Sequence, residues 1–204
     1  MAIIMGTNYF MEYKQAKEFL ENGNLKECID YFKSNNYMLE YGYSLMLSGD
    51  LENAEKIFRL YPTHRGDWAI KLIPLMQGIV GIIPTYFEIR SFLEIDITLL
   101  LKSGQTNFVQ YILGGADVFQ NVNRESYKFL GRALLKNGFM TSAKMFLDKS
   151  ISDYYRDPEL HYLFVEYYLM NNHTENALYA IENCLKINSD YYPAKLMKEK
   201  LLNK

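Results

Sequence analysis

The side chains that most often carry out chemistry are few in this sequence and lie far apart. The three histidines, His64, His161 and His173, have no cysteine or carboxylate at ligand spacing, so the three or four converging donors of a zinc site are missing. The two cysteines, Cys28 and Cys184, are distant in sequence and favour free, buried thiols that pack as small apolar residues. We therefore expect no metal site and no cofactor.

The sequence motifs of common catalytic and phosphate-binding sites are also missing. The chain has no Gly-x-Ser-x-Gly elbow, no phosphate loop ending in Gly-Lys-Ser/Thr and no Gly-x-Gly-x-x-Gly. Its carboxylates are scattered, and Glu94 and Asp96, which are two residues apart, would point to different sides of a helix. Because no acid–base pair can be nominated, the sequence indicates a protein that is not an enzyme.

One group of charged residues has the spacing of a binding surface. Lys128, Arg132 and Lys136 follow one another at four-residue intervals, which places them on one face of a helix. This basic stripe could bind an acidic segment of a partner, whereas most exposed charge stripes are simply solvated. The chain has a net charge of −2 and so lacks the positive field that nucleic acid requires, and we expect no nucleic-acid partner.

The composition favours helices around a continuous apolar core. Of the 204 residues, 49% are hydrophobic, 18 are tyrosine and only 5 are proline, a balance that favours long helices with half-buried contact surfaces. The uncharged stretch 72–87 is shorter than the about 20 apolar residues that cross a bilayer, and it contains two prolines. We interpret it as a buried helix pair with a turn and expect no membrane contact. Since Met1–Met5 is too short for a signal peptide, we expect a cytoplasmic protein.

A repeated helix–turn–helix pattern is the strongest signal in the chain. The segment 134–143 (LLKNGFMTSA) aligns with 168–177 (YLMNNHTENA) at an offset of 34 residues, and 19–28 and 45–54 fit the same frame. In each copy, glycine or asparagine supplies the left-handed residue that ends the first helix. Alanine or cysteine five residues later lets the two helices approach each other closely.

These copies resemble the tetratricopeptide repeat family. The middle of the chain, 63–115, diverges most, because no alanine follows Gly78 or Gly104 by five residues. The residues that carry the resemblance are Tyr127, Leu130, Gly131, Leu134, Gly138, Ala143 and Leu147 with Pro158 in one copy, His161, Phe164, Val165, Tyr168, Asn172, Ala177 and Ile181 with Pro193 in the next, and Gly42, Leu45, Ala54 and Phe58 with Pro62 in an earlier one.

The resemblance implies an all-α fold. We expect a single domain over 8–204, built as a right-handed superhelical array of antiparallel helix pairs, an α-solenoid, with about six pairs and a C-terminal capping helix. Gly114-Gly115 is the candidate for a break in the array. The expected helices cover residues 9–22, 25–34, 36–48, 51–60, 65–77, 83–93, 94–103, 105–113, 123–137, 140–152, 158–171, 174–187 and 191–203.

The resemblance also implies a binding surface, because in this family the first helix of each pair lines a concave groove. We expect a protein–protein interaction scaffold that holds a peptide or helix of a partner protein, with Trp68 among its apolar anchors. The acidic residues Glu94 and Glu166, at matching positions of neighbouring helices, could instead pair with the basic stripe and neutralise it. The implied groove residues are Tyr13, Lys17, Tyr43, Leu47, Trp68, Leu72, Lys128, Arg132, Lys136, Tyr162 and Glu166.

A second hypothesis is an assembly subunit that self-associates through its end repeats. Ile3, Ile4 and Phe10 are apolar and no polar cap helix covers them, and an uncovered apolar face attracts a partner. This end would form a homodimer contact or fold back on the first hairpin. The size of the protein in solution separates the two hypotheses.

Overall fold

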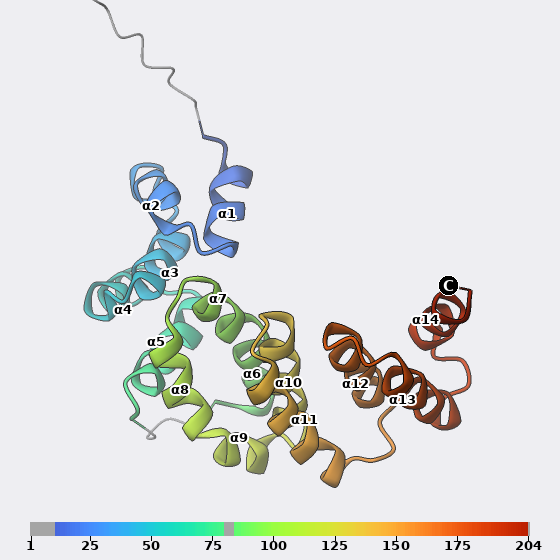
Figure 1. Ribbon diagram of the computed structural model, residues 1–204. Helices are drawn as coiled ribbons and strands as arrows, with labels where there is room; N and C mark the ends of the chain where they lie inside the picture. The colour runs from blue at the N-terminus through green and yellow to red at the C-terminus, as the bar shows by residue number, and fades with distance from the viewer. Residues whose placement is uncertain (1–10, 80–83, 204) are drawn as a thin grey trace, which may run out of the picture. The chain divides into compact units, whose positions relative to one another are not determined.

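Helices make up all of the regular structure in the part of the chain that the computed structural model describes, residues 11–79 and 84–203 (Figure 1). No strand occurs among these residues, so the all-α prediction is confirmed. The contacts group the chain into two compact units. The first unit is the chain up to Ile83 together with Leu99–Gly114, and the second is Pro84–Thr98 together with Gly115–Lys204. The predicted contact of Ile3, Ile4 and Phe10 falls outside the described residues.

The first unit is a series of short helices joined by tight turns around an aromatic and aliphatic core. Phe32 and Phe58 are almost completely buried in this core. The segment that begins at Leu99 is tied to the unit by Gln105, whose side-chain amide donates a hydrogen bond to the carbonyl oxygen of Leu47 at 2.9 Å. The helices are α1 (Tyr13–Glu21), α2 (Leu25–Ser34), α3 (Met38–Ser48), α4 (Leu51–Leu60), α5 (His64–Met76), the last part of α7 (Ile97–Lys102) and α8 (Thr106–Gly114).

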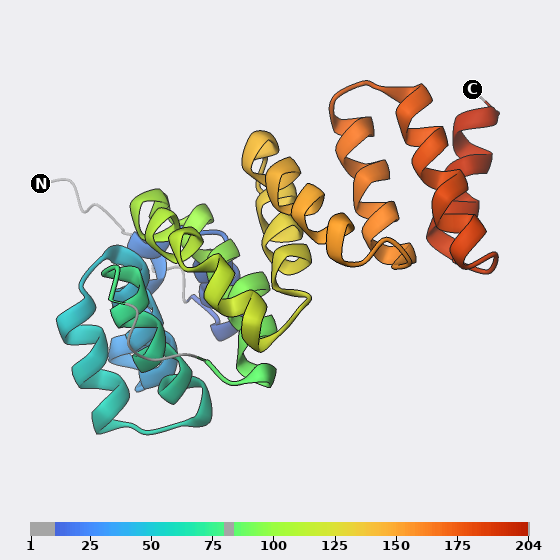
Figure 2. The ribbon, with the colours of Figure 1, turned by 90° about the horizontal axis from the view of Figure 1, so that it is seen from below.

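The second unit begins with short helices and continues with longer helical hairpins. Its core holds Phe129, Phe146 and Leu147, all almost completely buried. Figure 2 shows the last helices, drawn in orange to red, following one another side by side. The elements are α6 (Tyr86–Ser91), the π-helical turn η1 (Phe92–Asp96), the start of α7, then α9 (Ala116–Val122), α10 (Ser126–Lys136), α11 (Met140–Asp153), α12 (Pro158–Met170), α13 (Thr174–Ile187) and α14 (Tyr192–Leu202).

One kind of turn recurs between the helices of both units. At Gly138 the backbone is left-handed, with φ +80°. The next amide, of Phe139, donates to the carbonyl oxygen of Leu134 at 3.0 Å, while the amide of Gly138 donates to that of Leu135 at 3.1 Å. This pair of bonds is the Schellman motif, which satisfies the last carbonyls of a helix. The predicted left-handed turns are thus confirmed, and Asn36 adds one that was not expected. Among the described residues the set is Gly23, Asn36, Gly49, Gly78, Gly104, Gly138 and Asn172.

The space beside these turns differs from one turn to the next. A Cβ atom at Gly23 would overlap the backbone carbonyl of Lys102, whose Nζ donates to the carbonyl oxygen of Glu21 at 3.0 Å. At Gly138, by contrast, no atom lies within 4 Å of the position that a Cβ would occupy. Gly23 is therefore required for space as well as for conformation, whereas Gly138 is required for conformation alone.

Small residues lie where the paired helices touch, as the repeat frame predicts. Ala143 is completely buried, and a Cβ atom at Gly131 would lie 2.7 Å from Cδ2 of Leu147 on the partner helix. The hairpin of α3 and α4 has the same arrangement, since a Cβ at Gly42 would lie 2.5 Å from the ring of Phe58. These residues set how closely the axes of each hairpin can approach.

Two elements differ from the expected helices. Residues 86–102 form one helical run, with a π turn at Phe92–Asp96, in place of separate helices over 83–93 and 94–103. No glycine or proline interrupts this stretch, so nothing local ends the helix. The second difference is α9, which was not expected and is only seven residues long. The predicted break at Gly114-Gly115 is confirmed, because α8 ends at Gly114 and α9 begins at Ala116.

We predict that Gly131→Ala lowers the free energy of unfolding by about 1 kcal/mol. Alanine gains about 1 kcal/mol of helix propensity, but overpacking typically costs about 1–3 kcal/mol. Here the backbone nitrogen of Leu147, 3.3 Å from the new methyl group, cannot rotate away. Urea unfolding followed by circular dichroism measures the change. Gly114→Ala, where no atom lies within 4 Å of the added Cβ, is the control and should lose nothing. Equal changes in the two variants would contradict the predicted contact.

Candidate functional site

Three of the predicted groove residues in the first unit are core residues. Tyr43, Leu47 and Leu72 are almost completely buried, so a partner cannot reach them in this conformation. The reason is that α3 packs against α1, α2, α4 and α5, and all of its residues from Gly42 to Leu47 are buried. The prediction that these three side chains line an apolar groove is therefore wrong, because they pack in the interior of the unit.

The other predicted residues of the first unit are more open. Trp68 is half-buried, and the guanidinium of Arg65 lies 5.3 Å from the centre of its ring. The hydroxyl of Tyr13 donates to Oε1 of Glu40 at 2.7 Å, and this hydrogen bond, with burial, raises the pKa of Tyr13 to about 12. Lys17 is exposed. Trp68 and Lys17 therefore remain accessible.

In the second unit the basic stripe is largely occupied by the chain's own acids. The side chain of Lys128 is only 5% exposed. Its Nζ lies 2.5 Å from Oε1 of Glu125, 2.7 Å from Oδ2 of Asp157 and 3.0 Å from Oε2 of Glu159. An ammonium group with three carboxylate partners has no donor left for a partner protein.

Arg132 is held in the same way. Its side chain is 13% exposed, and Nη1 donates to Oε1 of Glu94 at 2.6 Å. Its Nη2 lies 2.5 Å from Oε1 of Glu159, in an ion-pair contact that lacks the alignment of a hydrogen bond. The intramolecular pairing with Glu94 is thus confirmed. Lys128 and Arg132 are not an open surface for an acidic segment, and only Lys136 of the stripe is exposed.

The titration behaviour of this cluster follows from its contacts. Burial disfavours the charged form of Lys128, but the hydrogen bonds to Asp157 and Glu125 outweigh it and raise the pKa of this lysine above its usual range. Burial likewise disfavours the charged form of Glu159, yet Lys128 and Arg132 lower its pKa. Lys128 and Glu159 are therefore both charged at neutral pH. The ion pairs of the cluster join η1, α10 and the start of α12.

The last two predicted residues lie on α12. The ring of Tyr162 packs against Tyr191, with centroids 5.6 Å apart. Glu166 is half-buried, and this burial raises its pKa although Lys136 and Arg132 act in the opposite direction. Of the predicted groove residues, Lys128 and Arg132 thus belong to one ion-pair cluster, whereas Glu166 only feels the charges of Lys136 and Arg132.

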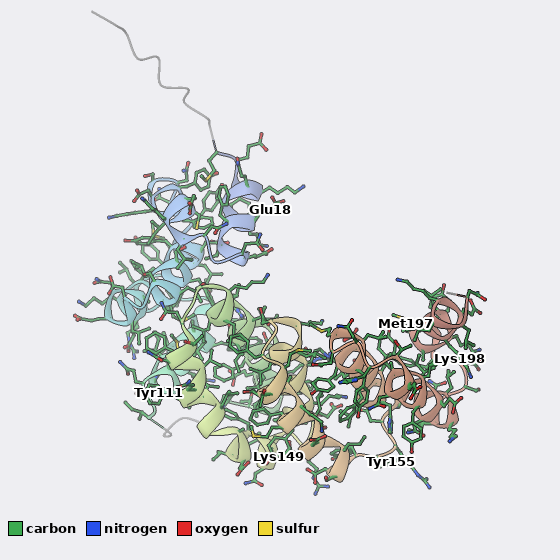
Figure 3. The ribbon with its side chains drawn as sticks, viewed as in Figure 1. Glu18, Tyr111, Lys149, Tyr155, Met197 and Lys198 are labelled. Atoms are coloured by element: carbon green, nitrogen blue, oxygen red, sulfur yellow. The ribbon has the colours of Figure 1, made fainter. Side chains whose placement is uncertain are left out.

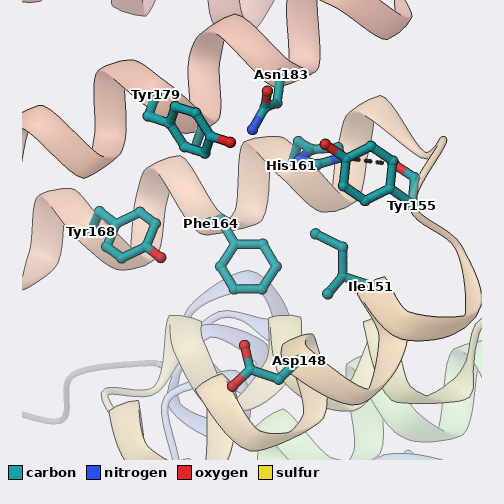
Figure 4. A pocket seen from close by; sticks show the side chains of 9 residues that line it. Asp148, Ile151, Tyr155, His161, Phe164, Tyr168, Tyr179 and Asn183 are labelled. Carbon is teal, nitrogen blue, oxygen red and sulfur yellow. Dashed lines mark hydrogen bonds between the residues drawn. The ribbon is translucent and has the colours of Figure 1, made fainter.

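A tyrosine-rich hollow that the sequence did not predict lies between α11, α12 and α13. Its volume is about 250 Å³. Figure 3 places Tyr155 at the loop that joins α11 to α12, and Figure 4 shows the hollow from close by. The lining residues are Asp148, Ile151, Tyr155, His161, Phe164, Tyr168, Tyr179, Ala180 and Asn183.

The inner wall of the hollow is polar. His161 is buried, and its Nε2 lies 2.7 Å from the carbonyl oxygen of Tyr155. Because a carbonyl only accepts, Nε2 of His161 carries a proton and donates it to Tyr155. Asn183 is 9% exposed, and its side-chain amide makes no hydrogen bond within the described part of the chain.

The outer wall carries one charged group, Asp148. Its Oδ2 accepts a hydrogen bond from Nζ of Lys144 at 2.6 Å. The rims are aromatic, since Tyr155 is 58% and Tyr179 is 65% exposed. The sequence contained a signal for this site, because His161, Phe164 and Tyr168 on one helix, and Tyr179 and Asn183 on the next, recur at three- and four-residue spacing. In the repeat frame, however, the first three are only packing positions.

The described residues contain no group of three or more histidines, cysteines or acids that could hold a metal ion. Cys28 and Cys184 are both buried, free thiols, and burial raises the pKa of Cys184 to about 11. None of the described helices is long and apolar enough to cross a membrane.

Comparison of the chain with protein-family models, curated proteins and solved structures finds no match.

We predict that Lys128→Met lowers the free energy of unfolding by about 3 kcal/mol, near the lower end of the cost of breaking a buried ion pair. Methionine keeps the length of the side chain but leaves Asp157, Glu125 and Glu159 facing one another without their cation. The matched control is Lys195→Met, which removes the more exposed pair with Asp190 and should cost much less, because solvent screens this pair. Urea unfolding measures both. Similar losses would show that the cluster is no stronger than a surface pair.

A second prediction concerns Glu166, whose pKa is raised in the folded chain. A raised pKa means that this group favours folding at low pH and loses that contribution as the pH rises through its folded pKa. Glu166→Gln should therefore be more stable than the parent at pH 7, and the difference should vanish below about pH 4. Urea unfolding across this range measures it. Glu175→Gln, at an exposed position of α13, controls for the loss of one negative charge. An equal gain in this control would contradict the burial argument.

Proposed function

We propose that this protein is a protein–protein interaction scaffold, built as a right-handed superhelical array of tetratricopeptide type, that binds a peptide or helix of a partner protein. Support comes from the hairpins of the second unit, where a Schellman turn and buried contacts at Gly131 and Ala143 recur with the spacing of that family. The proposal treats the helices as a rigid frame and assigns binding to side chains on their surface.

The observation that carries the proposal is the tyrosine-rich hollow between α11, α12 and α13. Tyr155 and Tyr179 are more than half exposed at its rim, and Phe164 is buried in its wall. Tyrosine is enriched in protein interfaces because its ring buries a large apolar area at little entropic cost while its hydroxyl can still hydrogen-bond. A concave aromatic surface that the chain's own side chains leave open is suited to anchor a partner side chain.

The concave groove that the family resemblance implies is a second candidate surface for the partner. Fewer of its side chains than predicted are free to contact one. Lys128 and Arg132 are already paired, so Lys136, Tyr162 and Glu166 are the residues of the second unit that could still contribute to it. They would add polar contacts around a partner held elsewhere.

Self-association is the alternative function, and the last helix supplies an observation in its favour. On α14, Tyr192, Leu196 and Leu202 are all more than half exposed. Exposed apolar side chains on a terminal helix attract a further helix or a second copy of the chain. This alternative would place the contact at the end of the chain and leave the hollow unused.

Photo-crosslinking from the hollow tests the proposal. A benzoylphenylalanine at position 179 should capture a partner protein in an extract of the native cells, because this side chain lies at the rim. The same substitution at Tyr111, an exposed tyrosine of the first unit, is the control and should capture much less. Adding Tyr168→Ala should weaken capture from position 179. A product of twice the chain's mass from both positions would instead support self-association, and equal capture of many proteins from both would contradict a specific site.

A further inference from the structure

We propose that Asn22 is a site of spontaneous deamidation, and that the isoaspartate formed there releases helix α1 from the rest of the first unit. This chemistry requires no partner protein and goes beyond the proposed binding function. An asparagine followed by glycine reacts faster than other asparagines, because glycine has no side chain to keep its backbone nitrogen away from the neighbouring side-chain amide. The sequence contains two such pairs, Asn22-Gly23 and Asn137-Gly138.

The reaction needs only the chain and water. The backbone nitrogen of Gly23 loses its proton to a base in the solvent and attacks Cγ of Asn22. The new N–Cγ bond closes a succinimide ring, while the Cγ–Nδ2 bond breaks and this nitrogen takes up a proton and leaves as ammonia. Water then adds to either ring carbonyl and opens the ring. Addition at Cγ gives aspartate, and addition at the backbone carbonyl gives isoaspartate, in which the main chain runs through the former side chain.

Both pairs lie in the same kind of turn, so turn geometry does not distinguish them. The asparagine backbone is alike, with φ −100° and ψ 2° at Asn22 and φ −103° and ψ 11° at Asn137. The amides of Gly23 and Gly138 each donate to a carbonyl three residues earlier at 3.1 Å. This bond holds the proton that the attacking nitrogen must lose, so each pair reacts when its turn opens. The rate therefore depends on how freely the asparagine side chain moves and how often the turn opens.

The two asparagine side chains are restrained to different degrees. Nδ2 of Asn137 donates to the carbonyl oxygen of Ala133 at 2.7 Å and to Oγ1 of Thr98 at 3.4 Å, and the residue is half-buried. These bonds hold the amide and its departing nitrogen in place. Asn22 is exposed, and its side chain makes no hydrogen bond within the described part of the chain. Its amide can therefore rotate to meet the backbone nitrogen of Gly23.

The helices that end in the two turns are also anchored to different degrees. On α1 only Ala16 and Leu20 are buried, and this helix packs mainly against α2 and α3. Most residues of α10 are buried, and it packs against α6, η1, α9, α11 and α12. Local opening costs less where fewer buried contacts are lost. The turn after α1 should therefore open more often than the turn after α10.

Isoaspartate at position 22 would disturb the place where the end of α1 meets the rest of the unit. The backbone at Gly23 lies so close to the carbonyl of Lys102 that even a Cβ atom has no room. Isoaspartate lengthens the main chain here by one methylene group and adds a carboxylate at the negative end of the helix dipole. No basic residue lies in the last turn of α1. The exposed ammonium of Lys102 can screen the new charge but cannot shorten the chain, so the last turn of α1 should open.

Peptide mapping of the aged full-length protein tests the inference, with the second pair as its internal control. The purified chain is incubated at slightly alkaline pH, where the attacking nitrogen loses its proton more readily, and mass spectrometry follows both positions. Position 22 should convert about tenfold faster than position 137, the factor that about 1.4 kcal/mol of extra opening free energy produces. In urea, where both turns are unfolded, the two rates should become alike. Equal rates in the folded chain, or the same ratio in urea, would overturn the inference.

Hydrogen exchange of the same samples tests the release of α1. After ageing, the amides at the end of α1 should exchange about tenfold faster than before. Asn22→Gln should keep its exchange pattern through the same treatment, because glutamine must close a larger ring and reacts far more slowly. Asn137→Gln is the matched control and should age like the parent. Unchanged exchange in α1 once isoaspartate has formed at position 22 would show that the helix is not released.

Discussion

The structure depends on one backbone constraint, which is that a tight turn between two helices needs a left-handed residue at the end of the first helix so that the chain can reverse. The seven turn residues from Gly23 to Asn172 meet this constraint with positive φ and paired 6→1 and 5→2 hydrogen bonds. The bonds satisfy carbonyls that would otherwise be left unpaired at the helix ends. Because each turn fixes where the next helix begins, it also decides which side chains of that helix face its neighbour. The contact at Gly131 and the placing of Tyr179 and Asn183 beside α12 both follow from such turns.

The charged cluster around Lys128 shows how a pattern typical of recognition can serve the fold. Three basic residues at four-residue spacing are indistinguishable in sequence from a peptide-binding stripe. In the structure, however, Lys128 and Arg132 form ion pairs with carboxylates from other elements of the same unit. Ion pairs of this kind contribute little net stability compared with apolar packing, yet they are costly to break. Their effect is to favour one arrangement of η1, α10 and α12 over others, since any shift would leave charges unpaired.

Local features of the fold could be predicted from the sequence, and features that depend on distant packing could not. The bounds of α2, α4 and α13 were predicted to the residue, because glycine, asparagine and apolar spacing mark them directly. By contrast, α9 is too short for a periodic signal. The burial of Leu47 and Leu72 depends on how many helices surround α3 and α5, which no short motif encodes. The hollow was missed for the same reason: the spacing of Tyr179 and Asn183 was visible, but the free amide of Asn183 became apparent only once three helices were in place.

Turn glycines with open surroundings and turn glycines packed against backbone should tolerate different substitutions during evolution. At Gly138 the surroundings are open, and two other turns of the same geometry carry asparagine, at positions 36 and 172. An exchange of glycine for asparagine at position 138 should therefore be nearly silent, since asparagine tolerates the left-handed region better than other side chains. Gly23 has no such freedom, because the carbonyl of Lys102 fills the space that any side chain would need. Among related chains, position 23 should stay glycine while position 138 drifts between the two residues.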